Sequence, residues 1–172
     1  YSNNTCSTVI STPINVGTYY VKATSAATSN LNAGASGCVS HTITKKADTV
    51  SITARSASYT GSAIGANTAS ATSGSGITYT YYSTTNCSGS AISTPINVGN
   101  YSVKVTTAGN SDYEPGSKCV THTITKGTPT ISLADKTATY TGSGIASNVA
   151  SGTIPNGTLV TLTYKYKYYT NN

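Results

Sequence analysis

The heptapeptide STPINVG occupies residues 11–17 and recurs unchanged at residues 93–99. The similarity extends in both directions, and the pentapeptide HTITK at residues 41–45 recurs in the same relative place at residues 122–126. Self-similarity at a fixed period is typical of chains that repeat one structural unit. Cys6 and Cys87 match each other and lie one period apart. We therefore expect a unit of about 80 residues, a size suited to a small β-sandwich.

This period divides the chain into one complete repeat and two partial ones. We expect the C-terminal half of one repeat at residues 1–46, a complete repeat at 47–127 and the N-terminal half of the next repeat at 128–172. One interpretation is a segment of a longer repetitive chain. The other is a set of subunits that meet head to tail and complete each other's split domain by strand addition. Head-to-tail contacts between subunits do not close and give filaments. A longer chain of tandem repeats also gives a fibre, so both interpretations predict one.

Composition and patterning predict an all-β protein. Only 8% of the residues are charged, against about 25% in an average domain, and 14 Tyr supply all of the aromatic surface. Apolar residues alternate with polar ones in four segments, at residues 49–54, 77–82, 101–107 and 120–125. Short alternating segments separated by Gly, Ser and Asn are typical of strands and turns in a two-sheet sandwich.

The alternation also predicts which side chains face the core. In the first segment, Val50, Ile52 and Ala54 share one face, and in the last segment His122 shares the apolar phase. In the third segment Lys104 falls on the outward face. We expect a thin core of Val, Ile, Ala and Tyr, with the two histidines, His41 and His122, partly buried and neutral.

The repeated heptapeptide itself is interpreted as a corner that leads into a strand. Its proline cannot donate a backbone hydrogen bond, so it belongs at a strand edge or entry. Its asparagine and glycine suit a turn that needs positive φ. We therefore predict positive φ in this corner, at Asn15 or Gly17 and at Asn97 or Gly99, just before the strands that contain Tyr19 and Tyr101.

A family resemblance rests on the order of these motifs. The series TYTGS, TYTYY, PINVG-x-Y-x-V-K and a terminal TITK resembles the MBG repeats of bacterial surface proteins. The resemblance covers the whole chain and is strongest at residues 13–22 and 95–104. It implies tandem immunoglobulin-like β-sandwich repeats that serve as stalk or spacer, without catalytic residues. The chain departs from the family in His41 and His122, where aliphatic residues are common, and in its regular cysteines.

The four cysteines predict one disulfide in each of two repeats. The spacing from Cys6 to Cys38 is the same as the spacing from Cys87 to Cys119. An even number of cysteines at equal spacing is typical of disulfides in an exported protein. A metal site is the alternative, but only three soft ligands are available in each repeat and no CxxC spacing occurs. We expect no metal and no cofactor.

Charge and chemistry exclude several classes of function. The net charge is +6, but the cationic residues are scattered and only one is Arg, whereas nucleic-acid-binding proteins concentrate basic residues on one face. The four acidic residues do not pair at a spacing typical of catalysis. No apolar run approaches the roughly 20 residues that span a bilayer. We therefore expect neither an enzyme nor a nucleic-acid-binding protein, and no membrane span in this segment.

Two functions remain. The first is a structural segment of a secreted or cell-surface fibre, stalk or filament whose partners are copies of itself or adjacent repeats. The alternative is an adhesin module that binds glycan or protein through exposed tyrosines, for which Tyr82 and Tyr169 are the candidates because they fall outside the core phase of their segments. Glycosylation sequons occur at four asparagines: Asn3, Asn86, Asn100 and Asn156.

Overall fold

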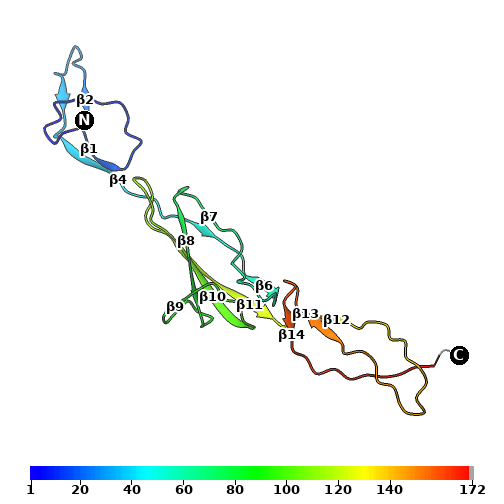
Figure 1. Ribbon diagram of the computed structural model, residues 1–172. Coiled ribbons are helices and arrows are strands. Elements are labelled where there is room, and N and C mark those ends of the chain that lie inside the picture. Colours follow the sequence, from blue (N-terminus) through cyan, green and yellow to red (C-terminus); the bar gives the residue numbers. More distant parts are fainter. Residues whose placement is uncertain (171–172) are drawn as a thin grey trace. The chain divides into compact units, whose positions relative to one another are not determined.

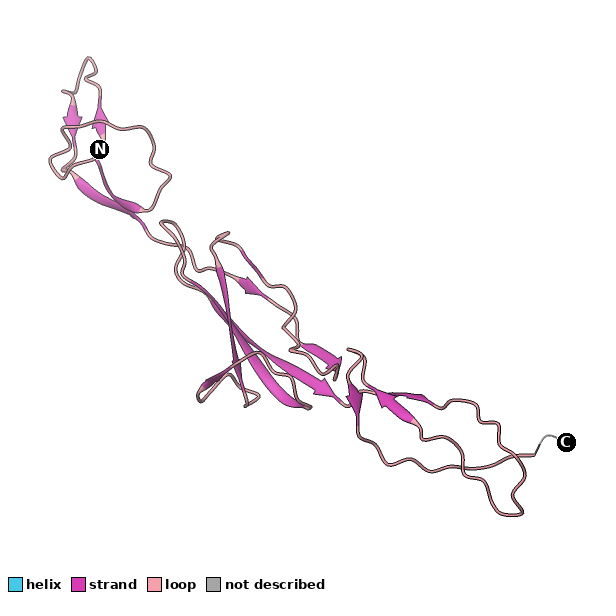
Figure 2. Ribbon diagram, in the orientation of Figure 1, coloured by secondary structure: helices cyan, strands magenta, loops and turns pink. Residues whose placement is uncertain are grey.

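The computed structural model describes residues 1–170, which form an all-β structure without helices (Figure 2). Strands alternate with long irregular connections, as expected from a chain rich in Ser, Thr, Gly and Asn. The strands are β1 (Gly17–Val21), β2 (Thr24–Ser25), β3 (Gly34–Ala35), β4 (Val39–Ile43), β5 (Val50–Ser51), β6 (Arg55–Ser58), β7 (Ser70–Ala71), β8 (Ile77–Tyr82), β9 (Ala91–Ile92), β10 (Gly99–Thr107), β11 (Ser117–Thr125), β12 (Thr130–Ser132), β13 (Ser151–Thr153) and β14 (Leu159–Val160).

The strands pair into five sheets (Figure 1). The largest has the order β6-β11-β10-β8-β9, in which β6 and β11 run parallel and the register places His122 opposite Arg55. Two-stranded sheets are formed by β1 with β4, β2 with β3, and β5 with β7, and β12-β13-β14 form the fifth sheet. The β1-β4 pair is antiparallel, with Gly17 opposite Ile43.

The chain divides into two compact units, each made of three segments. The first contains Tyr1–Ser51, Ala69–Thr78 and Val105–Lys118, and the second contains Ile52–Thr68, Tyr79–Lys104 and Cys119–Asn172. In the first unit, the backbone of Lys46 exchanges hydrogen bonds with the loop around Tyr113, donating to Asp112 O and accepting from Glu114 N, each over 2.9 Å. In the second unit, β6 joins the edge of β11.

Buried apolar side chains gather within residues 47–127. Of the sixteen exposed large hydrophobic side chains of the described residues, only Ile96 and Val98 fall in this range. Val103 is 1% exposed, whereas its sequence counterpart Val21 is 50% exposed. The strand positions that the pattern predicts to be apolar are therefore covered in the middle of the chain and uncovered on either side of it.

The prediction for the strand at residues 49–54 was partly wrong. Within that range the structure has one short strand, β5, and an irregular stretch follows it up to β6, which begins at Arg55. Val50 and Ile52 are buried as predicted, but Ala54 is exposed. Because β5 pairs with β7 while β6 pairs with β11, the segment changes partner between them and its alternation is interrupted. Lys104, predicted to face outward, is half-buried.

The prediction of positive φ in the STPINVG corner was wrong. Among the described residues, positive φ occurs at neither Asn15 nor Gly17 in the first copy, nor at their counterparts in the second. Instead the tyrosine after the corner holds it: Tyr19 donates its hydroxyl to Asn15 O and Tyr101 donates to Asn97 O, both over 3.0 Å. The glycine provides room for this ring, since a Cβ at Gly99 would lie 3.0 Å from Tyr101 Oη.

We expect Tyr101→Phe to lower the free energy of unfolding by about 1 kcal/mol, the net contribution of one hydrogen bond. The substitution removes only the hydroxyl that donates to Asn97 O. Urea denaturation followed by circular dichroism measures the change. Tyr140→Phe, in a largely exposed position, is the matched control and should leave the midpoint unchanged. Equal effects of the two substitutions would contradict this account of the corner.

Candidate functional site

Two disulfides connect the cysteines in the pairs that the spacing predicts. Cys6 is bonded to Cys38 and Cys87 to Cys119, with Cα atoms 5.9 and 6.1 Å apart. The first cysteine of each pair has positive φ, 51° at Cys6 and 55° at Cys87, and these are the only non-glycine residues with positive φ among those described. The two disulfide loops therefore share an unusual backbone feature as well as a spacing.

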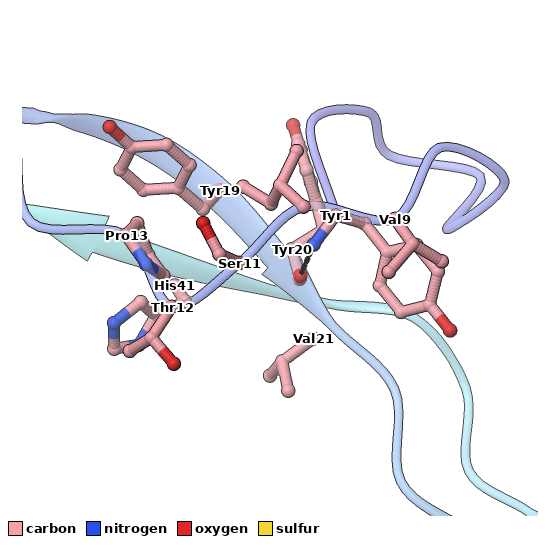
Figure 3. A pocket seen from close by; sticks show the side chains of 10 residues that line it. Tyr1, Val9, Ser11, Thr12, Pro13, Tyr19, Tyr20, Val21 and His41 are labelled. Carbon is pink, nitrogen blue, oxygen red and sulfur yellow. Dashed lines mark hydrogen bonds between the residues drawn. The ribbon is translucent and has the colours of Figure 1, made fainter.

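A cavity of about 370 Å³ opens in the first unit, beside the β1-β4 sheet (Figure 3). Its walls come from β1, from β4 and from the irregular segment that precedes β1. The lining residues are Tyr1, Val9, Ile10, Ser11, Thr12, Pro13, Tyr19, Tyr20, Val21 and His41. Tyr1 is held at this wall because its amino group donates to Tyr20 O over 2.7 Å. The lining is mostly apolar and aromatic, which suits a peptide or a hydrophobic side chain.

The two matching histidines lie in very different surroundings. His41 is exposed and lines this cavity. His122 is fully buried, its ring meets that of Tyr81 edge to face with centroids 5.9 Å apart, and neither ring nitrogen makes a hydrogen bond. The prediction of partial burial therefore fails at His41, which is exposed, and understates the burial of His122. In this structure the ring of Tyr81 packs against His122, whereas the ring of His41 faces the open cavity.

Burial of His122 has an electrostatic consequence. Removal from water disfavours the charged imidazolium and lowers the pKa of His122 below 6.5; the nearby Ile64 backbone counteracts part of this, and the positive charge of Arg55 adds to the lowering. The unfolded chain then binds more protons than the folded chain below pH 6.5. Stability is therefore fully present above this pH and falls as the pH decreases through it.

We expect His122→Leu to flatten the stability profile between pH 7 and pH 5, because the titrating group is removed. A single group contributes a slope of at most about 1.4 kcal/mol per pH unit. Urea denaturation of both proteins at several pH values measures this slope. His41→Leu changes an exposed ring and serves as the control, which should keep the wild-type profile at protein concentrations where the chain is monomeric. An unchanged profile in His122→Leu would contradict the assignment.

Asp48 forms a polar cluster in the first unit that the sequence did not suggest. Its carboxylate accepts hydrogen bonds from the hydroxyls of Ser73 and Thr107, each over 2.6 Å, and from Thr72 Oγ1 and Ser73 N, each over 2.9 Å. The Ser73 and Thr107 hydroxyls contribute most to holding the pKa of Asp48 well below its usual range. A carboxylate surrounded by donors in this way joins three segments and is unsuited to accept a proton near neutral pH.

The remaining candidate residues are dispersed. Tyr82 ends β8 and is half-buried, whereas Tyr169 lies outside the strands and is 84% exposed. Asn86, Asn100 and Asn156 are exposed. Asn3 is half-buried and its side-chain amide donates to Ser7 Oγ over 2.6 Å. Only the cysteines are therefore brought together as pairs.

No family model, curated protein or solved structure matches the chain. In the part of the chain that the structure describes, no group of three or more His, Cys, Asp or Glu could hold a metal ion. A helix long and apolar enough to cross a membrane is likewise not found among residues 1–170.

Proposed function

We propose that the chain is a structural segment of an extracellular fibre, stalk or surface filament, made of tandem immunoglobulin-like repeats stabilised by internal disulfides. The observation that carries the proposal is that individual hydrogen bonds recur with the sequence period. Arg55 donates to Gly65 O over 2.7 Å, and Lys136, one period later, donates to Ala146 O over 2.6 Å.

Two further pairs of contacts follow the same correspondence between repeats. The amide of Asn67 donates to Ala54 O, and that of Asn148 donates to Asp135 O. The hydroxyl of Tyr81 accepts from Ala66 N, and that of Tyr168 accepts from Ser147 N. Together with the contacts of Arg55 and Lys136, these two pairs support a local fold that recurs along the chain.

The strand order supports the immunoglobulin-like character of the repeat. In that fold, strands C, F and G form one sheet while A and B pair in the other, and a tyrosine near the start of strand F donates its hydroxyl to the backbone upstream. The order β8-β10-β11 and the pair β5-β7 correspond to these sets, and Tyr101 in β10 corresponds to the tyrosine. The Cys87–Cys119 disulfide departs from the pattern, since it does not join strands B and F.

A structural role agrees with the chemistry of the surface. Disulfides persist in oxidising compartments outside the cytosol, which supports a secreted or cell-surface location. Few charges and many hydroxyls leave little acid–base chemistry to carry out. Repeated small domains gain length by stacking units rather than by enlarging one core.

Electron microscopy of intact source cells labelled with antibodies against residues 47–127 tests this proposal. We expect label at regular positions along surface filaments or stalks. Label confined to the cell interior, or soluble material with no extended structures, would contradict it.

The adhesin role stays an alternative because Tyr169 is so exposed. A glycan array probed with the purified chain tests it. Saturable binding that Tyr169→Ala or Tyr82→Ala abolishes would favour the adhesin, since stacking of a sugar on tyrosine requires the ring. If the role is structural, no glycan should be retained.

A further inference from the structure

The outer edge of β4 is unpaired among the described residues. β4 pairs with β1 alone, whereas its sequence counterpart β11 pairs with β10 on one side and with β6 on the other. In the β6–β11 register, Arg55 lies opposite His122 and Ala57 opposite Ile124. The residues of β4 that match His122 and Ile124 are His41 and Ile43. An edge of this kind is a template for an added strand.

The cavity beside this edge lies where the complete repeat holds two of its own side chains. Ile64, 6% exposed, donates its backbone N–H to Pro95 O over 2.9 Å, and the ring of Tyr81 packs against His122. The counterparts of Pro95 and His122 are Pro13 and His41, and both line the cavity (Figure 3). The cavity thus has the walls of the repeat's core without the residues that fill it.

The same chain contains a second copy of those two residues, and in that copy both side chains are exposed. Ile145 and Tyr168, the counterparts of Ile64 and Tyr81, are 40% and 70% exposed. Residues 136–139, which match β6, are exposed and form no strand. This segment already has the local hydrogen bonds of its counterpart, from Lys136 to Ala146 O and from Ser147 N to Tyr168. It would therefore lose little conformational entropy on binding.

We propose that a second copy of this chain adds its residues 136–139 to the free edge of β4 as a parallel strand and inserts Ile145 and Tyr168 into the cavity. This inference rests on the proposed function and names its partner. The register places Lys136 opposite His41 and Ala138 opposite Ile43, and Ile145 N donates to Pro13 O. Each copy has one acceptor edge and one donor segment, so the contact is heterologous and repeats from copy to copy.

Two substitutions block the two sides separately. Val21→Asp places a carboxylate in the acceptor cavity, and Ile145→Asp places one on the donor segment; an unpaired buried charge should weaken association by about 100-fold or more. In sedimentation velocity, the wild-type chain should form long oligomers, and each variant alone should remain monomeric. An equimolar mixture should form 1:1 dimers and nothing larger, because one variant keeps its donor and the other its acceptor.

Matched controls change apolar residues whose counterparts remain exposed in the complete repeat. Ile14→Asp corresponds to Ile96, and Val149→Asp corresponds to Thr68. Both should form oligomers like the wild type. A monomeric wild-type chain, a mixture that does not dimerise, or controls that also dissociate would overturn the inference. If the wild type stays monomeric while antibodies still label filaments on cells, this contact is wrong and the fibre role stands.

Discussion

Replacing Cys87 and Cys119 together by serine should lower the free energy of unfolding of the unit that contains them by about 3–4 kcal/mol. The disulfide closes a loop with a sequence separation of 32 residues, and opening it restores conformational freedom to the unfolded chain. The effect is large relative to the total because a thin core supplies little stability of its own. A typical small domain is stable by only about 5–15 kcal/mol.

Thermal and urea denaturation of the double variant and the wild type, both without reductant, measure this change. Adding dithiothreitol to the wild type should reproduce the effect. The matched variant, Cys6→Ser with Cys38→Ser, opens a loop of equal length outside residues 47–127 and should leave the unfolding of residues 47–127 unaltered. Unchanged denaturation midpoints in Cys87→Ser/Cys119→Ser would show that packing alone stabilises the repeat.

Truncating Ile124 to alanine should cost about 2–5 kcal/mol, the range for a buried isoleucine that leaves a cavity. Ile124 is almost fully buried on β11, next to the equally buried His122 on the same face of the strand. The chain offers its own control, since Ile43 has the same sequence surroundings on β4 but is only half-buried. Ile43→Ala in the monomeric chain should therefore cost much less.

Urea denaturation at low protein concentration measures the two costs without the contribution of association. Equal losses for Ile124→Ala and Ile43→Ala would mean that the two halves are packed alike, against the difference in exposure. A larger loss for Ile43→Ala at high concentration, where oligomers form, would instead agree with the proposed contact between copies.

The alternation of apolar and polar residues predicted strands best where one strand keeps one partner. The segment at residues 77–82 coincides with β8, and the segments at 101–107 and 120–125 lie within β10 and β11. The prediction was partly wrong at residues 49–54, after which the chain leaves β7 and joins β11. Between Ile52 and Ala57 the more covered positions shift from even to odd residue numbers, and the alternation within residues 49–54 does not reveal this shift.

Candidate sites could be predicted where the spacing of the residues along the sequence is itself informative. The cysteine pairs are of this kind. Asp48 was missed because its donors Thr72, Ser73 and Thr107 are common residue types and Thr107 is 59 positions away. The hydrogen bond of the Tyr101 hydroxyl was missed although its partner, Asn97, lies in the repeated motif. The motif suggested that Asn97 adopts positive φ, whereas in the structure its backbone carbonyl accepts the hydrogen bond from Tyr101.

The sequence alone determined the repeat period, the all-β class and the pairing of cysteines, because these depend on identities and spacings along one chain. Only the tertiary structure decided which copies of the pattern are buried. His41 and His122 stand in the same pentapeptide, yet one lines an open cavity and the other is enclosed. Burial depends on which other segments lie across the strand, and an edge without a strand partner leaves its backbone N–H and C=O groups available to water or to an added strand.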